Sequence, residues 1–203
     1  MSNAHNIQLF YKANNKLGEG VLYDFASNSV YWVDMSCQKI CKLDASRQYS
    51  EIEIGEEPGF LVAVKNGGLI VGAGKKIILM NDNIVVGEVP LLCENLDVSV
   101  NDGSISPDGK TILFGTKHNS EIEKVGESFV IGDAIVRTDQ RFIVFNGPAF
   151  SLDGNQVYFT DSPTGIIKVA DYDQLTGRLS RVEEFARVPE VDGYPDGMAI
   201  DSE

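Results

Sequence analysis

Four side chains with oxygen atoms lie next to glycine or in an Asp-Gly turn, at points spread along the whole chain. They are Glu19, Asn101, Asn146 and Asp196. Glycine lets the backbone bend where other residues would be strained, so each of these side chains can point into an open space. Two carboxylates and two amides that met at one point would suit a hard cation, which prefers oxygen ligands. Glycine beside Asp or Asn is also ordinary turn chemistry, so the spacing leaves both interpretations open.

The histidines and cysteines disfavour several other kinds of site. The chain has two histidines and three cysteines: His5, His118, Cys37, Cys41 and Cys93. Two histidines exclude a three-His zinc site within this chain and make a Ser-His-Asp triad unsuitable. The cysteines lack zinc-knuckle spacing, and their odd number predicts free thiols in a reducing compartment. Because residues 1–8 are polar and do not form a signal peptide, we expect a cytoplasmic protein.

The charge of the chain limits its partners. The 203 residues are 43% hydrophobic and 23% charged, as in a soluble globular protein, and the formal net charge is −13. Nucleic acid and anionic membranes would repel such a protein, and no apolar run approaches the ~20 residues of a membrane helix. We therefore expect neither as a partner. The charge is compatible with cation binding, and solubility alone also explains it.

The segment 145–162 has the pattern of a complete pair of strands. Residues 146–148 predict a tight turn and 149–151 a short strand. A hairpin turn at 152–155 then leads to a second strand rich in β-formers at 156–161. Asn146 thus lies at a strand end, where a rigid sheet can present its side chain to a ligand.

This pattern of short strands and Gly-containing turns recurs along the chain. The second strand of each group is centred near Trp32, Ile70, Leu113 and Tyr158. A repeat of about 40 to 50 residues is typical of β-propeller blades, and no segment has helical period and length. The first group includes an expected entry strand at 7–11, and residues 194–201 predict the first strand of a fifth blade. The sequence therefore predicts one all-β propeller domain over residues 1–203, with about four blades plus one strand.

In a propeller, the loops that enter the innermost strands surround a central channel. Glu19, Asn101, Asn146 and Asp196 come just before the expected innermost strands. The topology therefore brings these four residues, from distant parts of the chain, to one channel. The aromatic residues of the second strands are expected to pack between blades; they are Tyr31, Trp32, Phe114 and Tyr158.

Four groups of motifs, taken in order, resemble the SMP-30/gluconolactonase/regucalcin-like family over nearly the whole chain. The first is Leu17-Gly18-Glu19-Gly20 with Tyr31-Trp32-Val33-Asp34. The second is Asn101-Asp102-Gly103 with Pro107-Asp108-Gly109 and Phe114-Gly115-Thr116. The third is Asn146-Gly147-Pro148-Ala149-Phe150-Ser151 with Tyr158-Phe159-Thr160-Asp161-Ser162, and the fourth is Pro195-Asp196-Gly197-Met198.

The resemblance implies a six-bladed propeller that hydrolyses sugar lactones or similar cyclic esters with one divalent ion in the channel. Calcium is the first expectation for this ion, with Zn²⁺, Mg²⁺ or Mn²⁺ as alternatives. Carried over by position, Glu19, Asn146 and Asp196 are the implied metal ligands. Asp196 is also the implied general base, and Asn101 the implied substrate contact. Two other readings stay open: a regucalcin-like calcium-binding protein without catalysis, and a catalytically silent propeller fragment.

The chain departs from the family pattern at three places. Ser99 occupies a substrate-binding position where family members often carry Arg, so recognition of a polar or anionic sugar acid is expected to be weaker. Lys117 and His118 follow Thr116 where the family usually has Met and a substrate loop, and His118 is expected in a solvent-exposed loop. Finally, the chain is shorter than six blades. A fragment is the first interpretation, and completion by another chain or a smaller closure are the alternatives. Open blade edges predict self-association.

Overall fold

The computed structural model describes residues 8–65 and 67–201, and these form four antiparallel sheets of four strands each. The first sheet contains β1 (Gly18–Asp24), β2 (Ser29–Asp34), β3 (Lys39–Leu43) and β4 (Tyr49–Glu53). The second contains β5 (Pro58–Ala63), β6 (Leu69–Ala73), β7 (Lys76–Asn81) and β8 (Ile84–Pro90). The third contains β9 (Val98–Ile105), β10 (Ile112–His118), β11 (Gly126–Ile131) and β12 (Ile135–Phe142). The fourth contains β13 (Phe145–Phe150), β14 (Gln156–Asp161), β15 (Ile166–Asp173) and β16 (Arg178–Arg187).

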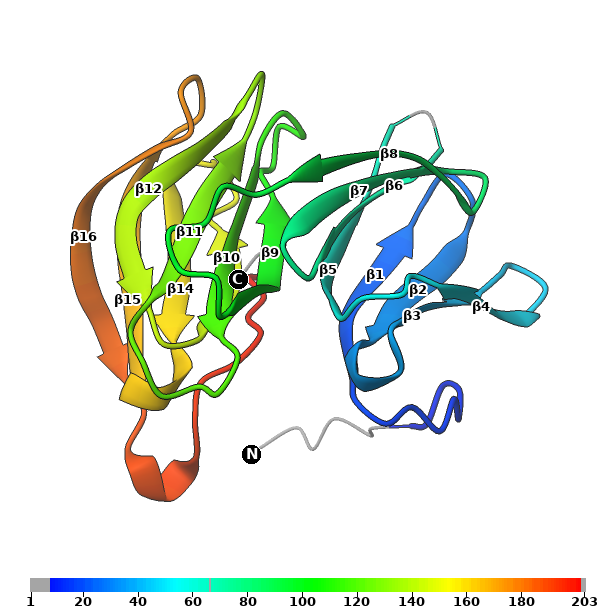
Figure 1. Cartoon of the computed structure of the whole chain (residues 1–203), viewed down its shortest axis with the longest axis horizontal. Helices are drawn as coiled ribbons and strands as arrows, with labels where there is room; N and C mark the ends of the chain where they lie inside the picture. The colour runs from blue at the N-terminus through cyan, green and yellow to red at the C-terminus, as the bar shows by residue number, and fades with distance from the viewer. Residues whose placement is uncertain (1–7, 66, 202–203) are drawn as a thin grey trace.

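The four sheets are blades of a β-propeller, as the repeat predicts. In each sheet the strands pair in chain order. The first strand of every sheet is innermost, and these inner strands contact one another in the order β1, β5, β9, β13 (Figure 1). The entry loops of these strands therefore meet around one axis, where the sequence places the candidate ligands.

Three layers between neighbouring blades form most of the hydrophobic core. A fourth, smaller cluster of Trp32, Cys41 and Leu43 lies within the first blade and its N-terminal segment, so Trp32 does not pack between blades as expected. The layer between the first and second blades includes Tyr31 and Val71, and that between the second and third includes Phe60 and Phe114. The largest aromatic group, between the third and fourth blades, is Phe142, Phe145, Phe150, Phe159 and Tyr172. The faces that two blades share are apolar because they pack against each other, and this stacking fixes the inner strands relative to one another.

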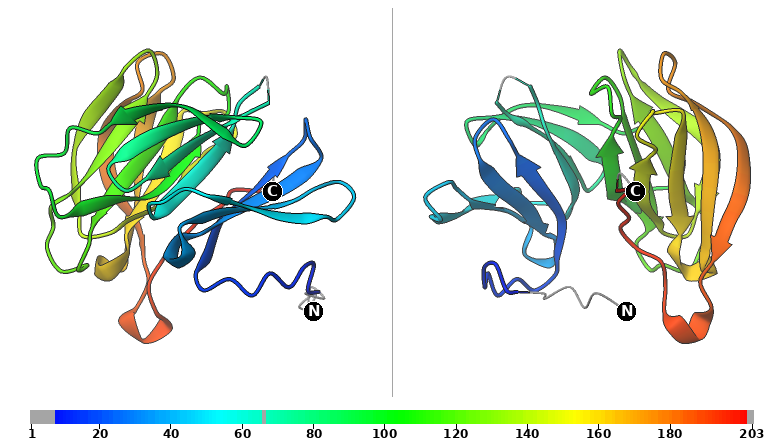
Figure 2. Two further views of the ribbon diagram at one scale, coloured as in Figure 1. Left: turned by 45° about the vertical axis from the view of Figure 1, so that its right-hand side comes forward. Right: turned by 180° about the vertical axis from the view of Figure 1, so that it is seen from behind.

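The segment expected to begin a fifth blade does not form a strand. Residues 194–201 carry no strand pairing and lie between the first and fourth sheets (Figure 2). A propeller strand takes its hydrogen-bonding partner from the neighbouring strand of its own blade, and none of the described strands pairs with this segment. The expected entry strand at 7–11 is also wrong over its described part, since residues 8–11 are not in a strand.

The expected tight turn at residues 146–148 is instead part of strand β13. Asn146 pairs with Thr160 and Ala149 with Tyr158, so the register shifts between them and the strand has a β-bulge. Gly147 adopts a φ of 58°, which the bulge requires and which glycine allows. Turn residues fit a bulge equally well, which is why the local sequence suggested a turn.

The only helices among the described residues are three short 3₁₀ turns: η1 (Met35–Cys37), η2 (Ser162–Thr164) and η3 (Glu190–Asp192). Within this part of the chain no helix is long and apolar enough to cross a membrane. The turns η1 and η2 directly follow β2 and β14, so two blades end their second strand in the same way. Cys37, Cys41 and Cys93 are free thiols, as predicted.

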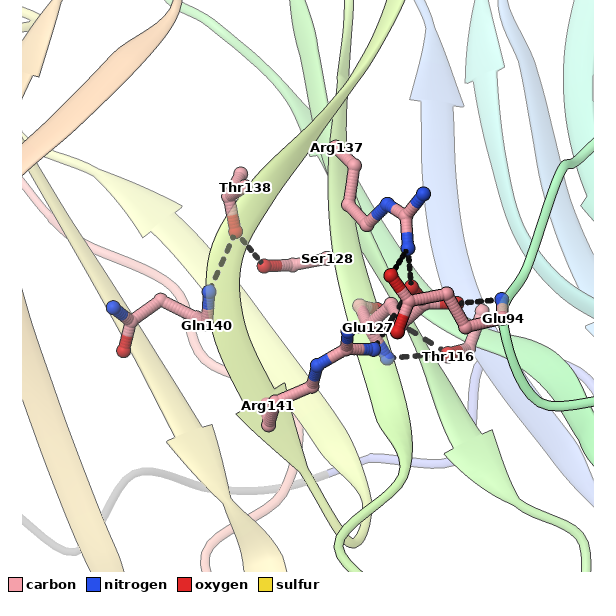
Figure 3. A network of polar contacts seen from close by, with 8 residues as sticks. All are labelled: Glu94, Thr116, Glu127, Ser128, Arg137, Thr138, Gln140 and Arg141. Carbon is pink, nitrogen blue, oxygen red and sulfur yellow. Dashed lines mark hydrogen bonds and ion pairs between the residues drawn. The ribbon is translucent and has the colours of Figure 1, made fainter.

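The third blade contains a fully buried carboxylate that ties the connection from the second blade to its outer strands (Figure 3). Glu127 Oε1 lies 2.7 Å from Arg137 Nη1 and 2.8 Å from Arg141 Nη1. The backbone N–H of Glu94 donates to Glu127 Oε2 at 3.0 Å. Because both carboxylate oxygens have hydrogen-bonding or ionic partners, the free-energy cost of burying the charge is offset. The same contacts hold the loop before β9 in place.

Candidate functional site

A cavity of about 410 Å³ at the centre of the molecule brings together the four polar residues singled out from the sequence. Its polar lining is Glu19, Asn101, Lys117, Glu121, Asn146, Ser162 and Asp196. Leu17, Met35, Val144, Pro163, Tyr194 and Pro195 complete the wall. The lining thus comes from β1, β9, β10, β13 and the C-terminal segment, which are far apart in the chain.

Hydrogen bonds fix the orientation of the Asn146 side chain, which is only 6% exposed. Its Nδ2 donates to Ser162 Oγ at 2.8 Å, and its Oδ1 accepts from Asn101 Nδ2 at 2.8 Å. Asn101 Nδ2 also lies 2.9 Å from the carbonyl oxygen of Phe145. The amide nitrogen of Asn146 therefore points toward η2, while its oxygen faces Asn101 across the cavity.

Glu19 and Asn146 occupy equivalent places in their blades. Each is followed by a glycine with positive φ, 59° at Gly20 and 58° at Gly147. In each strand the register with the second strand of the blade shifts just after this residue. A bulge redirects the side chain beside it, so β1 and β13 use the same local device to aim an oxygen donor at the channel.

Asp196 reaches the cavity because the C-terminal segment packs closely against the bulge of β13. A Cβ atom built on Gly147 would lie 2.5 Å from the carbonyl oxygen of Asp196, closer than any real contact of this kind. Glycine is therefore required at 147 both for its φ and for this approach. The carboxylate of Asp196 reaches the cavity although no strand holds the segment.

The charge of Asp196 acts on the carboxyl group of Glu19. Burial raises the pKa of Glu19, and the negative charge of Asp196 raises it further, while the ammonium of Lys117 opposes the shift. Two acids that meet in a partly desolvated space repel each other, and a divalent cation between them would relieve this repulsion. The donor set of two carboxylates and one neutral amide oxygen fits a hard divalent ion.

Asp102 lines an adjoining cavity, which shares Glu19 with the first, and it links two inner strands. Asp102 Oδ1 accepts from the N–H of Gly103 at 2.7 Å, and Oδ2 accepts from the N–H of Gly147 at 2.6 Å. Burial raises the pKa of Asp102 to about 6, against these hydrogen bonds, and the charges of Asp196 and Glu19 add to the rise. In the sequence this residue stands out only as part of the Asn101-Asp102-Gly103 motif.

Lys117 lines the cavity, although its sequence position predicted no role beyond a departure from the family pattern. Its Nζ lies 3.2 Å from Glu57 Oε1 and 3.5 Å from Glu121 Oε1. On the neighbouring strand its register partner is Ser99. The cavity wall at this point therefore presents an ammonium group from β10. The candidate substrate residue Ser99 is its neighbour on β9 but is not among the residues that line the cavity.

The expectation of a solvent-exposed loop histidine at 118 is wrong. His118 is the last residue of β10 and only 7% exposed. Its Nδ1 accepts from the N–H groups of Ile122 and Glu123 at 3.3 and 3.0 Å, and Nε2 lies 3.3 Å from Asp97 Oδ2. The imidazole is buried because it holds the loop that carries Glu121 to the cavity.

Among the described residues, no three His, Cys, Asp or Glu side chains gather in a way that could hold a metal ion. A site formed by Glu19, Asn146 and Asp196 contains only two such residues, because its third donor is an amide. This separates the candidate site from thiolate and imidazole centres, which suit zinc and other softer ions.

The chain is similar to several known proteins in sequence and in fold. Regucalcin of Xenopus laevis is 27% identical over 199 residues, which are 93% of this chain and 66% of that protein. A structure described as the calcium-binding protein regucalcin of Agrobacterium tumefaciens has a TM-score of 0.82 at 21% identity, over 93% of this chain and 65% of that chain. For a gluconolactonase of Xanthomonas campestris the TM-score is 0.73 at 19% identity, over 92% of this chain and 67% of that chain.

The two structural similarities show the shared fold, and the chain spans about two thirds of the length of these proteins. The model of the family described as "SMP-30/Gluconolactonase/LRE-like region" matches residues 17–203. This range includes the three blade motifs and the Asp196 segment from which the cavity is built. The chain is therefore a member of the SMP-30/gluconolactonase/LRE-like family.

Proposed function

We propose that the protein is a metal-dependent hydrolase that opens sugar lactones or similar cyclic esters. Glu19, Asn146 and Asp196 would hold one divalent ion, with calcium as the first candidate. The observation that supports this best is that these three side chains and Asn101 line one cavity. A protein of the same fold is named a gluconolactonase, and we extend that activity to this chain as a proposal.

The donor set matches the charge of the proposed ion. Glu19 and Asp196 contribute two negative charges, and the neutral amide of Asn146 adds a ligand without adding charge. A divalent ion held in this way stays electrophilic, and when bound it supplies Lewis-acid polarisation of the lactone carbonyl or of a water molecule. The hydrogen bond from Asn146 Nδ2 to Ser162 keeps the amide oxygen, rather than the nitrogen, available as the ligand.

The protein's own groups carry the proton transfers. Asp196 takes a proton from the attacking water while the water oxygen bonds to the carbonyl carbon. The ring ester bond then breaks, and the same proton passes to the departing ring oxygen. Water is thus consumed, and the product is the open hydroxy acid. Asn101 and Lys117 would hold the substrate from the cavity wall. Lys117 would donate from its ammonium group, and Asn101 would accept at Oδ1, because both hydrogens of its Nδ2 already bond to Phe145 and Asn146.

Calcium binding without catalysis is the second candidate function. Two observations favour it: every proposed ligand is a hard oxygen donor, and the regucalcin structure of the same fold is described as calcium-binding. A buffering role needs the three ligands but no base and no substrate contact, so the two candidates differ in the role of Asn101.

The deciding experiment measures hydrolysis of a panel of sugar lactones by the chelator-treated protein, before and after addition of Ca²⁺, Zn²⁺, Mg²⁺ or Mn²⁺. We expect turnover that disappears with chelator and returns with one of these ions. Turnover that ignores the chelator would contradict metal dependence. Binding of one ion per chain with no turnover of any lactone would favour the calcium-binding candidate instead.

A further inference from the structure

Asp34, at the end of β2, holds the loop that leads to Glu19. Its Oδ2 accepts from the backbone N–H of Lys16 at 3.0 Å, and its Oδ1 accepts from that of Leu17 at 3.1 Å. The N–H of Met35 returns a bond to the carbonyl oxygen of Leu17 at 3.0 Å. Asp34 is only 4% exposed. These contacts end two residues before Glu19.

Asp161, at the end of β14, makes the same contacts in the fourth blade. Its Oδ1 accepts from the N–H groups of Ile143 and Val144 at 2.8 and 3.0 Å. The N–H of Ser162 donates to the carbonyl oxygen of Val144 at 3.1 Å. In both blades the aspartate follows the two residues whose N–H groups it accepts by 18 and 17 positions. These contacts end two residues before Asn146.

The third blade lacks this device. By register, Thr116 lies opposite Val100 just before Asn101, as Asp161 lies opposite Phe145 just before Asn146. Thr116 Oγ1 instead accepts from the N–H of Glu127 at 2.8 Å, toward the outer strands (Figure 3). The aspartate therefore occurs in the first and fourth blades, which supply the proposed metal ligands Glu19 and Asn146. It is absent from the third blade, which supplies the proposed substrate contact Asn101.

We propose that Asp34 and Asp161 are positioning residues for the metal site: each clamps an entry loop so that the bulge after it delivers Glu19 or Asn146 to the ion. This inference rests on the proposed function. A carboxylate suits the task because one buried side chain can accept from two successive N–H groups that would otherwise be unpaired. Errors of about 0.5 Å in ligand position matter for a metal site, so the loop before the ligand must be rigid.

The two clamps differ in one respect that sharpens the test. Both oxygens of Asp34 accept hydrogen bonds, since Oδ2 also accepts from Asn15 Nδ2 and Oδ1 from the N–H of Cys37. Oδ2 of Asp161 is buried without a hydrogen bond from any described residue, and the ammonium of Lys124 lies 3.7 Å away. An amide can therefore replace the Asp161 carboxylate, whereas at Asp34 an NH₂ group would face other donors in either orientation.

The test compares the calcium affinity of five single variants of the full chain by calorimetric titration after chelator treatment. We expect Asp34→Asn, Asp34→Ala and Asp161→Ala each to lose roughly tenfold or more in affinity, as outer partners of metal ligands do. Asp161→Asn is expected to stay within about threefold of the wild type, because Oδ1 keeps its two bonds. This split between the two Asn variants would not arise from a general loss of stability.

The fifth variant, Asp24→Ala, is the matched control. At the opposite end of β1, Asp24 accepts from the N–H groups of Ala26 and Ser27 at 3.0 and 3.2 Å, far along the strand from Glu19. The Asp24→Ala substitution removes the same kind of contact but leaves both entry loops unchanged. The calcium affinity of this variant should therefore match that of the wild type. Wild-type affinity in folded Asp34→Asn, or an equal loss in Asp24→Ala, would overturn the proposal.

Amide hydrogen exchange gives a second readout that needs no metal. The N–H groups of Lys16, Leu17, Ile143 and Val144 should exchange slowly in the wild-type protein, and those of 143 and 144 should stay slow in Asp161→Asn and become fast in Asp161→Ala. Fast exchange of these N–H groups in the wild type would contradict the assignment of Asp34 and Asp161 as clamps, even if some variant fails to fold. If the wild type binds no divalent ion but shows this protection, the proposed function fails while the clamps as loop anchors stand.

Discussion

Nδ2 of Asn101, on the third blade, lies 2.8 Å from Oδ1 of Asn146, on the fourth. The proposed substrate contact and the proposed metal ligand are thus joined directly. Asn146 is also held by Ser162, from the far side of its amide. This arrangement divides the two roles: Ser162 orients the amide, and Asn101 faces the space where a substrate would lie.

The Asn101→Ala substitution tests this division. Because Ser162 still orients Asn146, we expect calcium affinity to change by less than about threefold. The KM for a sugar lactone should rise roughly tenfold, with a smaller effect on kcat, since a substrate hydrogen bond is lost in both ground and transition states. Steady-state kinetics with saturating metal measures this. A large fall in kcat at unchanged KM would instead place Asn101 in the chemical step.

Gly147→Ala should disable the site without unfolding the protein. The new Cβ would lie 2.5 Å from the carbonyl oxygen of Asp196, so the C-terminal segment must move away from β13. Gly109→Ala is the control, because Gly109 has a φ of 72° and open space around its Cβ position. Both variants carry comparable backbone strain of about 1 kcal/mol, but only Gly147→Ala should lose metal binding, measured by calorimetric titration. Equal metal affinities in the two variants would contradict this packing.

Acid should weaken the fold partly through Asp34. Burial alone would raise the pKa of Asp34, but hydrogen bonds from Lys16, Leu17, Asn15 and Cys37 outweigh it and lower the pKa to about 2. In the unfolded chain this pKa is about 3.9, so the ionised form stabilises the fold by about 2 to 3 kcal/mol at neutral pH. This contribution is complete above about pH 5 and is lost as the pH falls toward 2.

Urea denaturation at several pH values compares the wild type with Asp34→Asn. The difference in the free energy of unfolding between them should be largest at pH 7 and shrink by about 2 kcal/mol at pH 2 to 3. The control variant, Asp24→Asn, changes a half-buried carboxylate whose pKa is also lowered, mainly by the hydrogen bond from the Ser27 side chain, but by less than that of Asp34, so it should show a smaller pH-dependent difference. A constant difference across the range would mean that Asp34 is not held as a buried carboxylate acceptor.

The buried Glu127 should be the most sensitive position of the third blade. Glu127→Ala leaves two arginines without their buried partner and removes the acceptor of the Glu94 N–H, so we expect a loss of about 3 to 5 kcal/mol in the free energy of unfolding. Glu94→Ala removes an exposed partner of the same two arginines and should cost about 1 kcal/mol or less. Urea denaturation of both variants checks the contrast, and similar losses would contradict it.

The fold could be predicted from the sequence because it repeats. Each blade carries its own alternating strands and Gly-containing turn, so the same local signal appears several times and errors at single strands do not matter. The convergence of Glu19, Asn101, Asn146 and Asp196 on one cavity follows from this topology, since every entry loop of a propeller faces the same channel. Their proposed roles came from the family resemblance.

The features that the sequence did not predict depend on contacts between residues that are distant in the chain or on backbone groups. Residues 146–148 have the composition of a turn, and only pairing with β14 makes them a bulge. The segment 194–201 has strand-forming residues, but a strand needs a pairing partner, and none of the described strands provides one. His118 looked like a loop residue because its partners, the N–H groups of Ile122 and Glu123, are backbone groups that no side-chain pattern reveals.

The two clamp residues occupy equivalent positions in two motifs of the sequence. Asp34 and Asp161 end the two motifs Tyr-Trp-Val-Asp and Tyr-Phe-Thr-Asp, each at the same distance from a proposed ligand. The repeat of this spacing was visible, but the atoms that the carboxylates contact were not. Backbone N–H groups are present at every residue except proline, so sequence alone does not indicate which of them a carboxylate will accept.

The account depends most on an ion held jointly by Glu19, Asn146 and Asp196, and titration of the chelator-treated protein with calcium tests this directly. Wild-type protein should bind one ion per chain, and Asp196→Ala should bind none and hydrolyse no lactone. Binding of calcium by Asp196→Ala with wild-type affinity and stoichiometry would contradict the account.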